Sequence, residues 1–178
     1  MRTGRSYPHR LQVWIAAGLL IGTGLACMSS TGNISGCLPG IVPGTTTRDQ
    51  VISTLGKPAS SQQDGPVENL LYPSSYPGQF NSISVKDGVV GRISVVLDKE
   101  QPLKWSAVKS ILGKPAQALF TDYSDGSLVY IYPDKGWTFT ADESINLVYL
   151  RECFVPMSLA DYLNSWGKDL PTENPFIR

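Results

Sequence analysis

A short phrase, Leu-Gly-Lys-Pro-Ala, occurs twice in this chain, beginning at Leu55 and again at Leu112. Each copy follows a helix-like stretch and precedes strand-like stretches. Self-similarity of this kind is the sequence signature of a duplicated structural unit. We therefore predict two copies of one small unit in tandem.

The first copy ends a short helix. Thr47 and Gln50 have the spacing of a capping box, as does the pair one residue earlier, and Val51 lies four residues before Leu55 on one helical face. The glycine of the phrase can adopt the left-handed conformation at a helix end, and the proline prevents the helix from continuing. Strand-like runs follow at residues 68–72, 80–85 and 89–97, with an Asp-Gly hairpin turn between the last two.

The second copy repeats this order, with a helix at residues 105–112 and strand-like runs at 128–132, 137–140 and 145–150. Past Pro156, the pair Ser158 and Asp161 can cap a last amphipathic helix. Each unit is then one helix and three antiparallel strands, too small to bury much surface alone. We predict an α+β fold in which the two units form a two-layer sandwich, with helices on one sheet face and a C-terminal helix docked on the core.

The N-terminus has the pattern of an export signal: three arginines, an apolar run at residues 13–21 and small residues before Cys27. The apolar run is short for a membrane span. The sequence Gly24-Leu25-Ala26-Cys27 resembles a bacterial lipobox, although Gly24 stands where leucine is usual, and predicts a lipid on Cys27 that anchors the protein to a membrane outside the cytoplasm. The alternatives are ordinary cleavage after Ala26, which gives a secreted protein, and an uncleaved anchor.

These features divide the chain into five parts. We expect a signal peptide at residues 1–26, a lipid-anchor tether at 27–43, repeat units at 44–100 and 101–151, and a helix and tail at 152–178.

The charge distribution argues against nucleic-acid binding. The leader contains three of the 15 basic residues and none of the 15 acidic ones, so the body is mildly acidic. Attraction to phosphate backbones requires clustered Lys and Arg.

Cys37 and Cys153 remain if Cys27 is acylated. Two remaining cysteines in an exported protein are candidates for a disulfide, and this bond would tie the two ends of the body together. The alternative is two unpaired cysteines in apolar surroundings.

The sequence offers no convincing active site. Its one histidine, His9, lies in the leader, which removes histidine-dependent nucleophiles and metal sites from the mature protein. We expect no catalytic residue, metal or cofactor. One alternative is a cell-wall hydrolase that uses two carboxylates, for which Asp122 with Asp125 and Asp142 with Glu143 are candidates, although all four lie at predicted turns. Another is a carrier of lipid or a small ligand, which requires an apolar cavity.

Strand alternation predicts one apolar and one polar sheet face. We assign the following residues to the core: Ile83, Val85, Ile93, Val95, Trp137, Phe139, Ile145 and Leu147. Placing Leu71, Val129 and Ile131 with them turns their neighbouring tyrosines to the polar face. The predicted partner-binding surface then comprises Tyr72, Ser82, Ser84, Arg92, Ser94, Tyr130, Tyr132, Thr138, Thr140 and Asn146. Tyrosine with Ser, Thr and Arg is typical of recognition surfaces, although Tyr and Thr also favour exposed strands in general.

Residues 44–58 read Gly-x-Thr-Thr-x-Asp-x-Val-x-x-x-Leu-Gly-x-Pro. This opening, followed by a small antiparallel sheet, resembles the repeat of the β-lactamase inhibitor protein (BLIP-like) family and is similar to the SmpA/OmlA type of outer-membrane lipoprotein. The resemblance spans residues 44–151 and is weaker in the second unit, where Gln-Pro-Leu-Lys precedes the helix. It implies a non-catalytic role in binding another protein, here an unidentified envelope protein, because the inhibitors grip an enzyme with a sheet face and the lipoproteins bind partners in envelope assembly.

Overall fold

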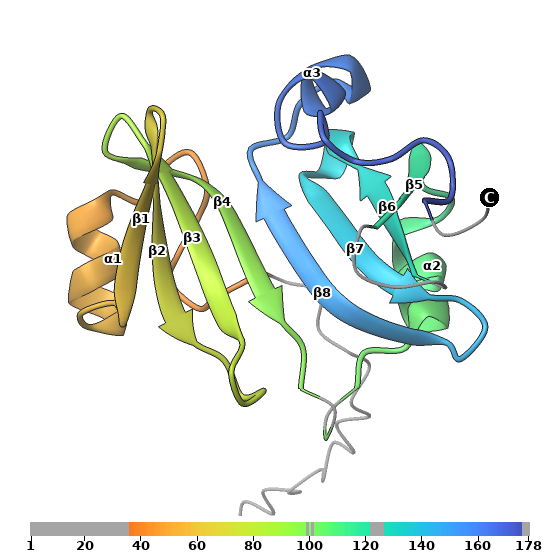
Figure 1. The fold of residues 1–178 in the computed structure, drawn as a ribbon, viewed down its shortest axis with the longest axis horizontal. Helices are drawn as coiled ribbons and strands as arrows, with labels where there is room; N and C mark the ends of the chain where they lie inside the picture. The colour runs from red at the N-terminus through yellow and green to blue at the C-terminus, as the bar shows by residue number, and fades with distance from the viewer. Residues whose placement is uncertain (1–35, 99, 101, 122–126, 176–178) are drawn as a thin grey trace, which may run out of the picture.

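The computed structural model describes residues 36–98, 100, 102–121 and 127–175 (Figure 1). The predicted signal peptide, the lipidation site Cys27 and the turn containing Asp122 and Asp125 lie outside the described residues. The first half contains α1 (Arg48–Leu55), β1 (Ser60–Asp64), β2 (Val67–Pro73), β3 (Phe80–Lys86) and β4 (Val89–Val96). The second half contains α2 (Trp105–Leu112), β5 (Gln117–Phe120), β6 (Leu128–Tyr132), the 3₁₀ turn η1 (Pro133–Lys135), β7 (Trp137–Asp142), β8 (Leu147–Phe154) and α3 (Leu159–Asn164).

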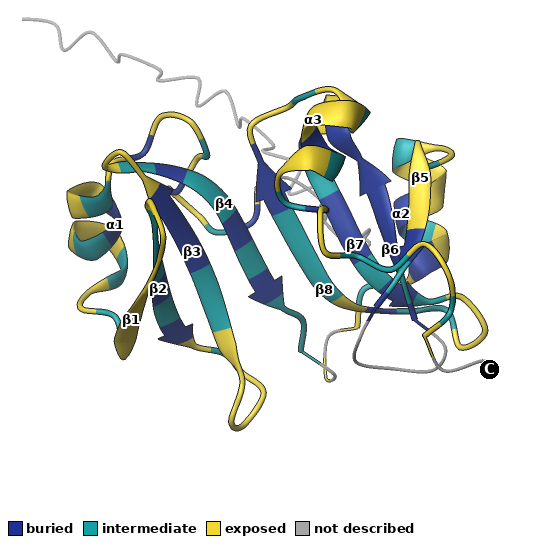
Figure 2. Cartoon of the chain, turned by 45° about the horizontal axis from the view of Figure 1, so that its top comes forward, coloured by how far each residue is buried: buried dark blue, intermediate teal, exposed yellow. Residues whose placement is uncertain are grey.

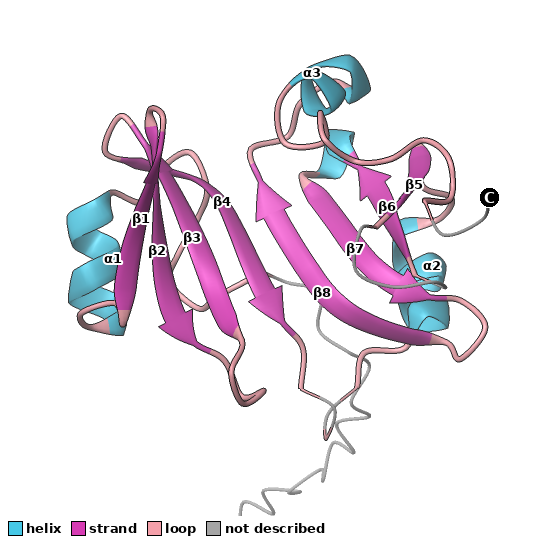
Figure 3. Cartoon of the chain, in the orientation of Figure 1, coloured by secondary structure: helices cyan, strands magenta, loops and turns pink. Residues whose placement is uncertain are grey.

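The strands form one antiparallel sheet of eight, in the order β1-β2-β3-β4-β8-β7-β6-β5 (Figure 3). The two halves therefore share a continuous sheet and meet where β4 pairs with β8, with Ile93 opposite Cys153 and Ser94 opposite Glu152. The predicted α+β class and C-terminal helix are confirmed. Each half has four strands rather than three, because β1 and β5 follow the repeated phrase directly and form the sheet edges. The polar sequence of β1 hid it, since an edge strand that is exposed throughout needs no apolar residue.

Helices α1 and α2 cover the same face of the sheet. Val51 of α1 packs in a core that includes Ile93 and Cys153, and Trp105 and Val108 of α2 pack in the adjoining core. Trp137 borders both cores, so they are continuous across the junction of the halves.

Helix α3 covers the opposite face, over the second half only. Tyr162 of α3 packs with Val129 and Ile131 of β6. Tyr130 and Tyr132 alternate with these two residues along the strand and pack on the other face, with Trp105 and Val108 of α2. The second half is thus a three-layer structure, whereas β2, β3 and β4 of the first half have no described helix on this side (Figure 1).

The helix caps follow the sequence in two cases of three. The Thr47–Gln50 capping box at the start of α1 is present, and the Ser158 hydroxyl accepts a hydrogen bond from the Asp161 amide at the start of α3. Lys104 precedes α2 and provides no side-chain cap. The amide of Ser106 instead donates to Oδ1 of Asn146, at 2.8 Å, from the turn between β7 and β8.

Part of the predicted tether belongs to the folded body. Cys37 and Ile41 are buried on the helix-covered face, and the amide of Gly44 donates to the carbonyl of Val90 at 2.7 Å. Residues 37–41 of the predicted tether are therefore part of the packed structure. Apolar Ile41 and the cysteine together provide enough burial to hold a stretch whose Ser, Gly and Pro content suggested a linker.

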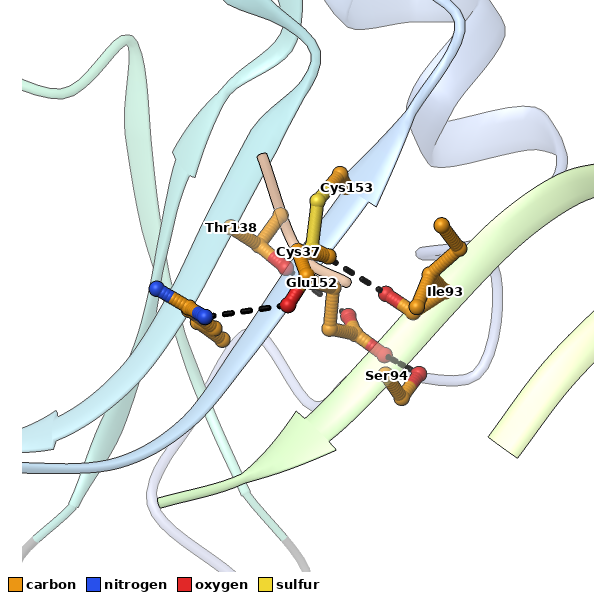
Figure 4. The surroundings of a disulfide bond; sticks show 7 residues. Cys37, Ile93, Ser94, Thr138, Glu152 and Cys153 are labelled. Carbon is orange, nitrogen blue, oxygen red and sulfur yellow. Dashed lines mark hydrogen bonds between the residues drawn. A yellow bond between two sulfur atoms is a disulfide. The ribbon is translucent and has the colours of Figure 1, made fainter. Parts of the chain in front are cut away.

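Cys37 and Cys153 form the expected disulfide, which joins this segment to the centre of the sheet (Figure 4). Their Cα atoms are 5.9 Å apart and their positions differ by 116 in sequence. Arg151 donates from Nη2 to the Cys37 carbonyl at 2.9 Å. Arg151 is half-buried, and this desolvation lowers the pKa of its guanidinium. The bridge thus fixes the N-terminal segment against the second half, although that segment precedes the first.

Among the described residues, each helix is too short or too polar to cross a membrane.

Candidate protein-binding face

We give the name open face to the side of the sheet away from α1 and α2, over the first half and the junction. No described helix covers β2 and β3 on this side, whereas Trp166 lies against Gly91 and Arg92 of β4. Its members alternate along the strands with the buried residues of the helix-covered face. It comprises Leu71, Phe80, Ser82, Arg92, Ser94, Val96, Thr140, Leu150 and Glu152.

A row of small hydroxyl side chains crosses the open face. Ser82 lies between Leu71 and Ser94 in the strand register, and Ser94 lies opposite Glu152. All four are partly exposed. Ser82 and Ser94, the two residues at the middle of this row, thus place two short hydroxyl side chains side by side on adjacent strands.

An apolar row runs beside the hydroxyl row. Phe80 lies opposite Pro73, and Leu150 lies between Val96 and Thr140. Phe80 is 45% exposed, although it lies within a strand. An exposed aromatic residue next to partly exposed aliphatic ones is informative, because such groups mark contact surfaces when they are contiguous.

Glu152 is the centre of a polar cluster at the junction of the halves. Its carboxylate accepts a hydrogen bond from Ser94 Oγ at 2.6 Å and one from Thr138 Oγ1 at 2.8 Å (Figure 4). Arg92 Nη1 lies 3.8 Å from the same carboxylate, and the side chains of Arg92 and Glu152 are 25% and 14% exposed. The two side chains thus form a partly shielded ion pair across β4 and β8.

Trp166, in the segment that follows α3, borders this cluster. The Arg92 guanidinium carbon lies 4.6 Å from the centre of the Trp166 ring, in a cation–π arrangement, and the ring also covers Gly91. Burial raises the pKa of the neighbouring Tyr162 phenol well above its ordinary range, and the charge of Glu152 adds to this. Tyr162 of α3 and Trp166 after it thus cover one side of the open face.

The predicted binding residues divide into three groups. Ser82, Arg92, Ser94 and Thr140 lie on the open face and are partly exposed, as expected. Ser84 and Thr138 lie on the same side but are each only 1% exposed. Ser84 donates to Oδ1 of Asn69 at 2.7 Å and Thr138 donates to Glu152, so both act as internal supports.

The three tyrosines were assigned to the wrong face. Tyr72, Tyr130 and Tyr132 are buried beneath α1 and α2. Tyr130 stacks on Trp105 with a ring separation of 4.0 Å. Two neighbouring leucines in β2 allowed either alternation, and Leu70 rather than Leu71 is the fully buried one. A tyrosine can enter a core when its hydroxyl finds a partner there.

The turn before β8 also differs from the prediction. Asn146 has a positive φ of 56° and caps α2, so it belongs to no sheet face. Ile145 is exposed and Leu147 half-buried, whereas Val148 is buried. The cause is a shift in register between Thr140 and Ala141, which exchanges inward and outward positions at this end of the strand.

Sequence reasoning missed Glu152 and Trp166 as members of the site. Glu152 lies between Arg151 and Cys153 at the end of β8, beyond the predicted strand boundary at residue 150. Extending the alternation from Leu150 by one step places Glu152 on the outer face, so a longer strand was the available signal.

The described candidates for carboxylate chemistry, Asp142 and Glu143, are held by local hydrogen bonds and an ion pair. Hydrogen bonding from Ser144 lowers the pKa of Asp142, and the hydrogen bond from Lys109, followed by the charge of the same side chain, lowers the pKa of Glu143. Asp122 and Asp125 lie outside the described residues. Within the described ranges there is no cluster of His, Cys, Asp and Glu suited to a metal ion. A depression beside α1 is lined by polar Thr45, Thr46, Gln50 and Thr54 with Gly40, and not by the apolar groups that a lipid carrier requires.

Comparison with known proteins gives fold-level similarity alone. No protein-family model matches the chain, and no curated protein matches it. One similar solved structure is a DUF4309 family protein (YjgB) from Bacillus subtilis subsp. subtilis str. 168, with 15% identity, 66% of this chain and 83% of that chain covered, and a TM-score of 0.49. Another is an extracellular protein containing a SCP domain from Bacillus anthracis str. Ames, with 12% identity and a TM-score of 0.50. That match covers 77% of this chain, which spans only half the length of the other protein.

Proposed function

We propose that this protein is a non-catalytic binding module outside the cytoplasm, which holds another envelope protein against its open face. The observation that carries the proposal is the partly exposed combination of Phe80, Leu150, Ser82 and Ser94 beside the Arg92 ion pair. Aromatic and aliphatic groups supply buried area in protein interfaces, while hydroxyl groups and an arginine supply directional hydrogen bonds.

Rigidity supports the same interpretation. The open face is built on paired strands from both halves, and the disulfide of Cys153 lies on the opposite side of the same strand. A preordered surface loses little conformational entropy on association, which favours affinity. The hydroxyl groups of Ser94 and Thr138 are already oriented by their hydrogen bonds to Glu152, so a partner meets a surface of fixed shape.

Two features support a location outside the cytoplasm. A disulfide that connects the ends of a folded body persists in oxidising compartments, and the N-terminal sequence has the pattern of an export signal. The structural neighbour from Bacillus anthracis is an extracellular protein, which agrees with this location.

We further propose that Cys27 carries the lipid anchor and that the module belongs among BLIP-like and SmpA/OmlA-type proteins. A short stretch separates Cys27 from the buried Cys37, so an anchored module lies close to the bilayer. The intact mass of the protein from the membrane fraction tests the anchor. A chain that begins at an acylated Cys27 supports it, and an unmodified soluble chain contradicts it.

Binding to envelope preparations tests the function. Labelled protein is titrated onto envelope fractions of the native host, and saturable binding is expected. The double variant Phe80→Asp with Ser82→Arg places charges on the open face and should weaken binding at least about tenfold, as loss of central contacts does. Ile111 on α2 is also an exposed apolar residue and lies on the helix-covered side, so Ile111→Asp is the matched control. Equal loss in both variants, or no loss in either, contradicts the proposal.

A further inference from the structure

The guanidinium of Arg92 on the open face makes no hydrogen bond to a described residue. Its Nη1 atom lies 3.8 Å from the Glu152 carboxylate, which is beyond hydrogen-bond distance. Its Nε atom is buried without a hydrogen-bond partner, and the side chain as a whole is 25% exposed. The two Nη atoms therefore reach the surface, and within the described part of the chain no acceptor is bonded to them.

Glu152 receives its hydrogen bonds from hydroxyl groups instead. Ser94 donates to Oε1 at 2.6 Å and Thr138 donates to Oε2 at 2.8 Å, so each carboxylate oxygen has a donor closer than Arg92. The two charged groups thus attract each other without a hydrogen bond between them. The carboxylate is satisfied within the protein, whereas the guanidinium is not.

Trp166 restrains Arg92 without satisfying its donors. The guanidinium carbon lies over the indole ring, 4.6 Å from the ring centre. Such a cation–π contact stabilises the positive charge, but the ring supplies no oxygen acceptor for the N–H groups. The arginine is therefore held in place between Trp166 and Glu152 with most of its hydrogen-bonding capacity available.

Asn69 adds a second donor to the same part of the open face. Asn69 lies opposite Ser84 in the strand register, and Ser84 lies opposite Arg92. The Asn69 carbonyl oxygen accepts from Ser84 at 2.7 Å, and its amide nitrogen, Nδ2, makes no hydrogen bond to a described residue. Because neighbouring strands are 4.7–4.9 Å apart, this amide and Arg92 belong to positions roughly 10 Å apart. This row across β2, β3 and β4 thus presents donors to a partner.

A partner protein that covers the open face removes water from these donors. Strand β4 consists of buried and half-buried residues, so little contact is needed to complete their burial (Figure 2). A buried donor without an acceptor costs binding free energy, and a charged donor costs most. A carboxylate has two oxygens that match the terminal nitrogens of an arginine, and this charge-assisted pairing is stronger than a hydrogen bond to a neutral carbonyl.

We infer that the partner protein presents an aspartate or glutamate side chain to Arg92 and a neutral acceptor to Asn69. This inference rests on the proposed function and specifies the partner's chemistry: an acidic group next to apolar groups that contact Phe80 and Leu150. Arg92 then contributes to selectivity, because a basic group at the same place would meet a like charge.

Three variants test the inference in the envelope-binding titration. Arg92→Gln removes the cation and should weaken binding at least about tenfold, as expected for loss of a hydrogen bond between charged groups. Arg92→Lys keeps the charge beside Glu152 but lacks the planar fork, so its loss should be intermediate. Glu152→Gln removes the internal competitor for Arg92 and should bind at least as well as the wild type. Melting temperatures identify variants that fold normally, and Arg92→Lys provides the test if Arg92→Gln does not.

Chemical amidation of the envelope provides the complementary measurement. A water-soluble carbodiimide with methylamine converts accessible carboxylates of the envelope fraction to neutral amides before the labelled protein is added. The affinity of the wild type should fall at least about tenfold, whereas that of Arg92→Gln should fall less, because the contact between Arg92 and a carboxylate is already absent.

Three results would overturn the inference: folded Arg92 variants that bind like the wild type, equal losses in Arg92→Gln and Glu152→Gln, or amidation that weakens wild type and Arg92→Gln equally. The second result would mean that the ion pair only supports the surface. If Phe80→Asp with Ser82→Arg still abolishes binding in these cases, the proposed function stands without the inference. If the wild type does not bind untreated envelopes, both fail.

Discussion

The hydroxyl of Tyr132 donates a hydrogen bond to the backbone carbonyl of Gly113, at 2.9 Å. The first half repeats this contact, with Tyr72 donating to Gly56 at 3.0 Å. Both glycines end a helix with positive φ, and each belongs to the repeated phrase. The repeat therefore encodes a joint in which a tyrosine on the second strand of each half secures the end of the helix above it.

Removing the hydroxyl at either joint should destabilise the protein. Tyr132→Phe and Tyr72→Phe each leave a glycine carbonyl without its partner, and we expect a loss of about 1 to 2 kcal/mol in the free energy of unfolding. Denaturant unfolding measures it. Tyr130→Phe is the matched control, because its hydroxyl makes only a 3.4 Å contact with Glu143 and its loss should cost less. Equal costs at all three positions would contradict the role of the joint.

The Cys37–Cys153 disulfide closes a loop that spans most of the folded body. For such a loop, the chain-entropy model gives about 4 to 5 kcal/mol of stabilisation. We expect reductant to lower the melting temperature strongly in the wild type and to have no effect on Cys37→Ala with Cys153→Ala. If the reduced and oxidised forms melt at the same temperature, the bridge does not hold the ends of the body together.

Tyr130 gives a prediction for alkaline pH. Burial, followed by the charge of Glu143, raises the pKa of this phenol from 10.0 to about 12. The folded state therefore keeps the proton that the unfolded state releases, so the stabilisation is complete below pH 10 and is lost as pH rises through 12. Unfolding by denaturant at neutral pH and in this alkaline window should show a smaller decline for Tyr130→Phe than for the wild type. An identical decline would mean that Tyr130 ionises normally.

Gly136 is required between η1 and β7 for two reasons. Its φ is +70°, and a Cβ there would lie 2.3 Å from the Phe154 carbonyl oxygen. We expect Gly136→Ala to cost about 2 to 4 kcal/mol, the sum of left-handed strain and overpacking. Gly88→Ala is the control, because Gly88 has a similar φ of +78° and open space around it, and it should show the strain alone, about 1 to 2 kcal/mol. Thermal unfolding compares them, and equal costs would contradict the steric account.

Much of the architecture could be predicted because local signals and the fold agree. The Thr47 capping box and the Ser158 cap are both present, and the Asp87-Gly88 turn joins β3 to β4. These features depend on neighbours within a few residues. The tandem order of helix and strands also follows from local patterns repeated along the chain.

The face of the sheet that each tyrosine occupies could not be predicted in this way. Leu70 and Leu71 make either alternation equally apolar, and the deciding interaction joins Tyr72 to Gly56 across a turn. The second half adds a further ambiguity, because Val129 and Ile131 are buried by α3 while Tyr130 and Tyr132 are buried by α2. Both faces are interior there, so alternation in polarity disappears.

The candidate site was predicted in part. Ser82, Arg92 and Ser94 follow the simple alternation of central strands and lie where expected. Glu152 joins them through pairing between β4 and β8, which are far apart in sequence. Such pairing depends on how the two halves meet, and no local pattern carries that information.

Photocrosslinking from position 80 tests the central claim most directly. p-Benzoylphenylalanine replaces Phe80 on the open face in one variant and Ile111 on α2 in the other, both at exposed positions, and irradiation is carried out in the native host's envelope. If the open face holds a partner, position 80 gives one discrete adduct with an envelope protein, and position 111 gives none. Adducts of equal yield from both positions, or none from position 80, would contradict the claim.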